Sequence, residues 1–151
     1  MIKLICVGKI KETFFEDAIR EYKKRLNRYT KLDIIEVEDV RGNNPSIIKA
    51  KEGEFIQRHI EIKDYVITLE IEGINFTSEA FSERLEKLQM ENVNIVFIIG
   101  GSYGLDEKIK NRSNLAISFS KLTFPHQLFR IIFLEQLYRA YKIINNETYH
   151  K

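Results

Sequence analysis

Residues 94–105 read NIVFIIGGSYGL, and residues 115–130 read LAISFSKLTFPHQLFR. Each segment begins with an apolar run, Ile95–Ile99 or Leu115–Phe119, of the kind found in buried strands. The first run ends in a glycine loop, and the second ends in a polar loop that leads through Pro125 into a helical pattern. Ligands of open α/β sheets bind beyond the carboxyl ends of such strands. We therefore predict that these two strands end side by side and that their loops form a binding site.

The rest of the chain alternates between strand and helix patterns. Apolar runs predict strands over residues 2–7, 32–37 and 64–71, the last followed by a turn at Glu72-Gly73. Helical spacing predicts helices over 12–28, from Ser46 as N-cap to about 60, from Thr77 or Ser78 to about 88, over 105–112, and over 125–144. Five alternations predict an α/β fold, with a parallel sheet covered by helices on both faces. No linker or repeat is visible, which predicts one domain over residues 1–151.

Composition excludes several classes of protein. Of the 151 residues, 44% are hydrophobic and 30% are charged, as in an ordinary globular domain. No apolar run approaches the roughly 20 residues of a membrane helix, and the N-terminus lacks the pattern of a signal peptide. The single cysteine, Cys6, excludes a disulfide framework and makes the cytoplasm the expected compartment. We expect Cys6 to be a buried apolar side chain rather than a nucleophile.

The net charge of +2 conceals an uneven distribution. Residues 8–31 contain eight Lys/Arg and four Asp/Glu, and residues 121–151 contain five and two, whereas residues 32–92 contain seven and fourteen. A polyanionic partner that contacts both basic ends is one interpretation, and solvated helix faces are the other. The last helix is apolar around more than one stripe, with Phe129, Ile132, Phe133 and Leu137, which predicts a homodimer that buries the second face.

The two loops do not match the common phosphate-binding motifs. Gly100, Gly101 and Gly104 fit neither GxGxxG nor a P-loop, and we expect them to let a flat ligand approach the backbone closely. The second loop offers polar backbone groups beside Leu122 and Phe124, which are suited to enclosing an adenine ring, with Leu69 as a further wall. No cluster has metal-ligand spacing, so no metal is predicted.

Two further groups of side chains are candidates for contact with a substrate. His126 and Arg130 lie one helical turn apart, and both are predicted to point toward the loops. The C-terminal Tyr149, His150 and Lys151 carry groups that stack on bases and bind phosphates.

Three segments, GGSYGL, SFSKLTFPHQLFRIIFLEQLYRAYKI and the terminal YHK, closely resemble the SPOUT-class ribosomal RNA large subunit methyltransferase H family. These enzymes methylate N3 of a pseudouridine in 23S ribosomal RNA. IKLICVGKIKE and VITLEIEG also resemble the family, so the likeness covers essentially the whole chain. The departure is Lys151, where some members have arginine, which keeps the charge but loses bidentate phosphate geometry.

The resemblance implies an α/β fold with a C-terminal deep trefoil knot, with the knot and cofactor loops at about residues 94–130. It implies S-adenosylmethionine as the cofactor, bound in a bent form, and a homodimer in which one subunit's tail reaches the other's pocket. The substrate would be an assembled ribosome. The positions that match cofactor contacts are Leu69, Gly100, Gly101, Phe119, Ser120, Lys121, Leu122, Thr123 and Phe124. Those expected near the target base are His126, Arg130, Tyr149, His150 and Lys151.

The implied reaction requires alignment of the methyl group with N3 and loss of the N3 proton. His126, His150 or water are the alternatives for the proton acceptor. Two other functions remain open from the sequence. One is a non-catalytic ribosome-associated factor that uses the same basic faces, and the other is a flavodoxin-like module that binds FMN.

Overall fold

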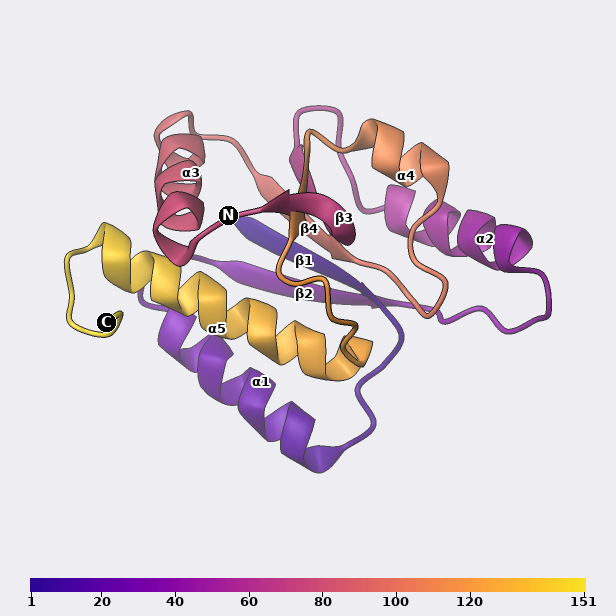
Figure 1. The fold of residues 1–151 in the computed structure, drawn as a ribbon, viewed down its shortest axis with the longest axis horizontal. Helices are drawn as coiled ribbons and strands as arrows, with labels where there is room; N and C mark the ends of the chain where they lie inside the picture. Colours follow the sequence, from indigo (N-terminus) through magenta and orange to yellow (C-terminus); the bar gives the residue numbers. More distant parts are fainter.

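The computed structural model describes residues 1–151 as five strands and five helices in strict alternation (Figure 1). In chain order these are β1 (Ile2–Val7), α1 (Thr13–Leu26), β2 (Leu32–Val37), α2 (Pro45–Gln57), β3 (Tyr65–Asn75), α3 (Ser78–Met90), β4 (Ile95–Ile99), α4 (Glu107–Arg112), β5 (Leu115–Ser118) and α5 (His126–Ile144). All strand pairs are parallel, in the order β2-β1-β4-β3-β5. The predicted parallel α/β sheet is confirmed.

Helices cover both faces of the sheet, also as predicted (Figure 1). On one face α5 packs between α1 and α3, and on the other α2 packs beside α4. Alternate residues of the central strand β4 serve the two layers, because side chains in a strand point to opposite faces. Phe97 belongs to the core under α5, and Val96 and Ile98 belong to the core under α2 and α4.

The order of the strands corrects one prediction. β4 and β5 do not end side by side, because β3 lies between them and pairs with both. Their carboxyl ends still reach the same edge of the sheet. The pairing of β3 with β4 ends at Leu69 and Ile99, and this end lies between the two loops. This arrangement explains why Leu69 faces the same space as the loops that follow β4 and β5.

The turn predicted at Glu72-Gly73 is wrong. β3 continues to Asn75, with an irregularity between Leu69 and Ile74 in its pairing with β5. A Cβ atom on Gly73 would lie 2.6 Å from the carbonyl carbon of Ile117. Gly73 therefore allows two backbones to approach closely rather than reversing the chain.

The structure also tests the predicted N-caps of two helices and the predicted burial of Cys6. α2 is capped by Asn44 rather than Ser46, since Asn44 Oδ1 accepts from the Ser46 backbone N–H at 3.0 Å and Pro45 occupies the first helical position. Thr77 caps α3, as expected. Cys6 is fully buried, and burial raises the pKa of its thiol to about 12, which excludes a thiolate nucleophile at neutral pH.

Candidate functional site

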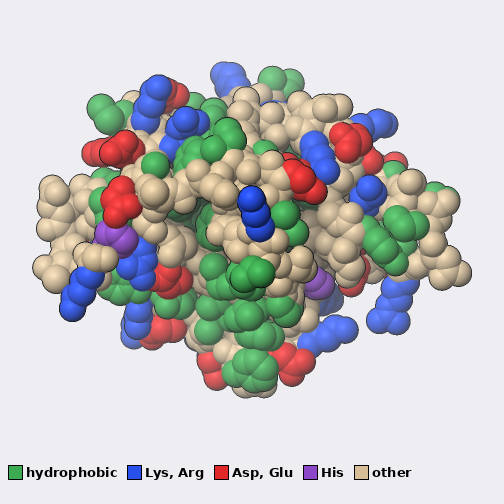
Figure 2. All heavy atoms as spheres, viewed as in Figure 1, with side chains coloured by type: hydrophobic (Ala, Val, Ile, Leu, Met, Phe, Trp, Pro, Cys, Tyr) green, Lys and Arg blue, Asp and Glu red, His purple; other side chains and the backbone are tan.

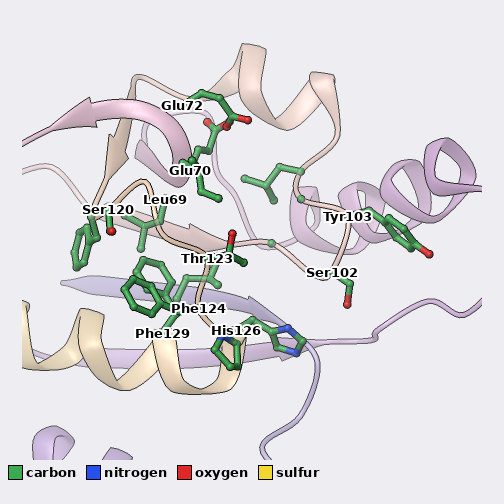
Figure 3. A pocket seen from close by; sticks show the side chains of 18 of the residues that line it. Leu69, Glu70, Glu72, Ser102, Tyr103, Ser120, Thr123, Phe124, His126 and Phe129 are labelled. Carbon is green, nitrogen blue, oxygen red and sulfur yellow. The ribbon is translucent and has the colours of Figure 1, made fainter.

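A large pocket lies at the carboxyl edge of the sheet, between the ends of β3, β4 and β5 and the start of α5 (Figure 3). Its volume is about 740 Å³, within the range of pockets that hold small molecules. Nine of the twenty lining residues are hydrophobic. This is the place where open parallel sheets bind their ligands.

The glycine loop after β4 is a tight turn. The Gly104 backbone N–H donates to the Gly101 carbonyl at 3.0 Å, and Gly104 has a positive φ of 83° that favours glycine. The missing side chains of Gly100 and Gly101 face the protein itself. A Cβ atom on Gly100 would lie 3.0 Å from Leu105, and one on Gly101 would lie 3.0 Å from Val7 Cγ1 and 3.1 Å from Glu52 Oε1. At these two positions glycine thus allows close packing beneath the loop.

The loop after β5 is held by serine side chains. Ser118 Oγ donates to the Ser120 carbonyl at 3.1 Å, and the Leu122 backbone N–H donates to Ser120 Oγ at 2.9 Å. This turn leaves Leu122 71% exposed beside the pocket. Phe124 stacks on Phe129 of α5, with ring planes 2° apart and centroids separated by 6.2 Å. The result is a flat apolar wall next to free loop backbone.

Most of the predicted cofactor-binding residues line this pocket. Those that do are Leu69, Gly100, Gly101, Phe119, Ser120, Leu122, Thr123 and Phe124. Lys121 is exposed and is not among the lining residues. The pocket therefore draws its predicted members from three separate segments of the chain.

His126 and Arg130 occupy different environments, although they lie one turn apart on α5. His126 is the first residue of the helix and lines the pocket. Arg130 is 1% exposed and does not line it. Its Nη1 donates to Glu36 Oε2 at 2.6 Å, and its Nη2 donates to the Gly8 carbonyl at 3.1 Å. Arg130 therefore joins α5 to the ends of β1 and β2.

The C-terminal tail packs on the far end of α5. Tyr149 Oη donates to Glu135 Oε1 at 3.1 Å, and the Tyr149 ring meets Tyr138 edge to face. His150 contacts Arg139 and Glu79. Arg139 lies roughly 20 Å along the helix from His126. The tail thus packs against α5 and α3 and is remote from the pocket.

Sequence reasoning missed the charged end of the pocket. Glu70 and Glu72 of β3 and Lys110 of α4 line it, opposite His126, Phe124 and Phe129 (Figure 3). Glu70 Oε1 lies 3.5 Å from Lys110 Nζ, and Thr68 Oγ1 donates to Glu70 Oε2 at 2.6 Å. Adjacency to Leu69 was a signal for Glu70. No local signal pointed to Lys110, which is brought there by tertiary packing.

No group of three or more His, Cys, Asp or Glu side chains is placed to hold a metal ion. None of the helices combines the length and the apolar composition needed to cross a membrane.

Residues 1–150 match the model of a family described as predicted SPOUT methyltransferase, and the chain belongs to this family. Curated relatives share its full length. One, from Caldicellulosiruptor saccharolyticus, is 51% identical over 154 aligned positions that cover 100% of both chains. Another, from Clostridium botulinum, is 50% identical over 157 positions that cover 99% of each. Both are named ribosomal RNA large subunit methyltransferase H, which confirms the resemblance drawn from the motifs.

Proposed function

We propose that this protein is an S-adenosylmethionine-dependent methyltransferase that methylates N3 of a pseudouridine in 23S ribosomal RNA, within assembled ribosomes in the cytoplasm. One observation carries the proposal. The pocket at the carboxyl edge of the sheet is built from the loops after β4 and β5, in a chain about half identical, over its whole length, to ribosomal RNA large subunit methyltransferases H. We include in the proposal that residues 94–130 form a deep trefoil knot.

The residues of the pocket fit the cofactor. Leu69, Phe119 and Phe124 offer apolar walls for an adenine ring, and the loop at Gly100-Gly101 offers backbone groups for its edge. Glu70 and Glu72 add negative charge against a single Lys110, which suits a cationic sulfonium better than the phosphate of FMN. When bound, S-adenosylmethionine would supply a methyl group on a sulfonium sulfur, for which the resulting thioether is a good leaving group.

The contribution of the chain is then mainly to position the reactants. Alignment of two reactants is worth up to about 10⁵–10⁸ M in effective concentration. His126 lines the pocket at the start of α5, and we take it as the candidate acceptor of the N3 proton. Arg130 holds that end of α5 against the sheet. Neither task requires a metal ion.

A homodimer completes the proposal. Tyr149 and His150 contact α5 at Glu135 and Arg139, roughly 14 and 20 Å along the helix from His126, so a role for the tail at the target base requires a second subunit. Apolar side chains gather in a column over α5 and the start of α1 (Figure 2). The exposed apolar side chains on these helices and the loop before α5 are Phe14, Leu122 and Leu128. We assign the dimer contact to this apolar column.

Two measurements test the proposed function. Calorimetry should detect binding of S-adenosylmethionine and no binding of FMN. Tritiated methyl groups should be incorporated into 23S RNA of ribosomes from a strain that lacks the enzyme, and mass spectrometry should place the methyl on pseudouridine. Cofactor binding without methyl transfer would favour the non-catalytic ribosome factor, and FMN binding would favour the flavodoxin-like alternative.

A further inference from the structure

A carboxyl group is buried directly beneath the glycine loop. Glu52 of α2 is 2% exposed, although it carries an ionisable side chain. Its Oε2 accepts one hydrogen bond, from the Val40 backbone N–H at 3.1 Å, and its Oε1 has no partner. No Lys, Arg or His forms an ion pair with it. A buried polar atom without a partner is rare in folded proteins and calls for an explanation.

The neighbour of this carboxyl is Gly101, which lines the candidate cofactor pocket. A Cβ atom on Gly101 would lie 3.1 Å from Glu52 Oε1 and 3.4 Å from Oε2, so any larger residue would press on the carboxyl. The next residue of α2, Gly53, makes the same kind of approach to Asp106, at the other end of the loop. α2 therefore supports the loop through two residues, Glu52 and Gly53, and Glu52 is the one with an ionisable side chain.

The surroundings of Glu52 favour its neutral form. Burial, and then the carboxylate of Asp39 in the loop after β2, raise the pKa of Glu52 from 4.5 to about 7. Of the neighbouring elements, β1 contributes the apolar Val7 and the segment ahead of α4 contributes the acidic Asp106. On the α5 side His126 lies near Asp39, since a Cβ atom on Gly8 would be 3.6 Å from His126 Nε2 and 3.9 Å from Asp39 Cβ. Ionisation would place a second carboxylate beside Asp39, with a single N–H donor to stabilise it.

We propose that Glu52 is a positioning residue for the cofactor, which as a neutral carboxylic acid holds Gly101 in the conformation that lines the pocket. Ionisation draws the carboxylate toward water, shifts Gly101 and weakens cofactor binding. Glu52 does not line the pocket, so it acts through the loop rather than on the ligand. The inference rests on the proposed function for the identity of the ligand, but the proximity of Glu52 to Gly101 stands without it.

The test compares the affinity for S-adenosylmethionine across pH in wild type, Glu52→Gln, Glu52→Ala and Glu54→Gln. The affinity of wild type should fall about tenfold between about pH 6 and about pH 8.5. This is the change expected if binding of the cofactor raises the pKa of Glu52 by one unit. Glu52→Gln, which remains neutral, should keep the low-pH affinity throughout. Glu52→Ala should bind weakly at every pH, and Glu54→Gln, exposed on the same helix, should follow wild type.

The difference between wild type and Glu52→Gln is decisive, because titration of the ligand's own amino group affects both proteins alike. An equal decline in the two proteins, or none in wild type, would overturn the inference. Should Glu52→Gln not fold, the amide resonance of Gly101 in wild type without ligand supplies the test. It should titrate with a midpoint near 7, and a resonance that does not move refutes the coupling. Absence of S-adenosylmethionine binding at every pH would instead refute the proposed function, and the Gly101 titration would still decide the role of Glu52.

Discussion

Arg130 and Glu36 form an ion pair with Nη1 and Oε2 2.6 Å apart, and it joins the first turns of α5 to the end of β2. The Arg130 side chain is 2% exposed and that of Glu36 is 34% exposed. The same Glu36 oxygen accepts from the Ile10 backbone N–H at 2.9 Å, so the pair also holds the loop between β1 and α1. This geometry supports a positioning role for Arg130 beside the pocket.

Arg130→Gln should therefore reduce stability as well as activity. Loss of one member of a largely buried pair is expected to lower the free energy of unfolding by about 2–3 kcal/mol, below the fully buried range because water reaches Glu36. Urea denaturation measures this change in the free energy of unfolding. Arg20→Gln, in an exposed pair with Asp17, is the control and should change stability by less than about 0.5 kcal/mol. Normal stability with lost methyl transfer would instead point to direct contact between Arg130 and the substrate.

Glu52 should make stability depend on pH in a defined direction. Its pKa is raised in the folded protein to about 7, so the folded state binds the proton more tightly than the unfolded state does. Its contribution to stability is therefore full below about pH 4.5 and is lost as pH rises through 7. Relative to wild type, Glu52→Gln should gain about 2–3 kcal/mol between about pH 5 and about pH 8. A constant difference between the two denaturation curves would contradict the raised pKa.

His126→Gln separates catalysis from cofactor binding. Removal of a positioned base is expected to lower the rate of methyl transfer by about 10²-fold or more. The affinity for S-adenosylmethionine should change only slightly, because His126 is one of twenty lining residues. Single-turnover methyl transfer at saturating cofactor measures the rate. An unchanged rate would leave His150 or water as the proton acceptor.

Deletion of residues 149–151 should abolish methyl transfer while leaving cofactor binding intact. We expect a loss of at least about 10²-fold, the scale of losing substrate positioning. The tail also contributes to the fold, because Tyr149 packs on Tyr138 and donates to Glu135. A modest loss of stability should therefore accompany the deletion, and Tyr149→Phe, which keeps the ring packing, is the control. Full methyl incorporation by the truncated protein would remove these residues from the site.

Leu128→Glu tests the dimer. Leu128 is 37% exposed on α5, so a charge there should leave the subunit folded and prevent association. Phe133 and Leu137, which the sequence offered as contact residues, are fully buried in their own subunit and are unsuitable for this test. Wild type and Ile62→Glu, at a 98% exposed site elsewhere, should sediment as dimers at micromolar concentration. A monomeric wild type, or a dimeric Leu128→Glu, would refute the assigned contact.

The second apolar face of α5 shows where sequence reasoning reached its limit. Periodicity indicated that α5 has more apolar surface than the sheet can cover, and this is correct. Much of that surface packs on α1 and α3 of the same chain. Hydrophobic pattern specifies that a side chain will be buried but not which neighbour buries it.

The sequence by itself determined the alternation of strands and helices, the parallel sheet and the two loops that line much of the pocket. These follow from patterns within about ten residues, where backbone geometry decides which side chains share a face. Even the position of Glu52 follows from spacing, because it lies four residues from both Ile48 and Ile56 and so shares their buried face of α2.

Only the tertiary structure decided that β3 lies between β4 and β5, that Arg130 turns to Glu36, and that Glu52 lies beneath Gly101. Each of these contacts joins segments more than 40 residues apart or depends on the order of the strands. Such contacts form when whole helices and strands pack together. The residues between two contacting segments affect the contact only through the length of the connection.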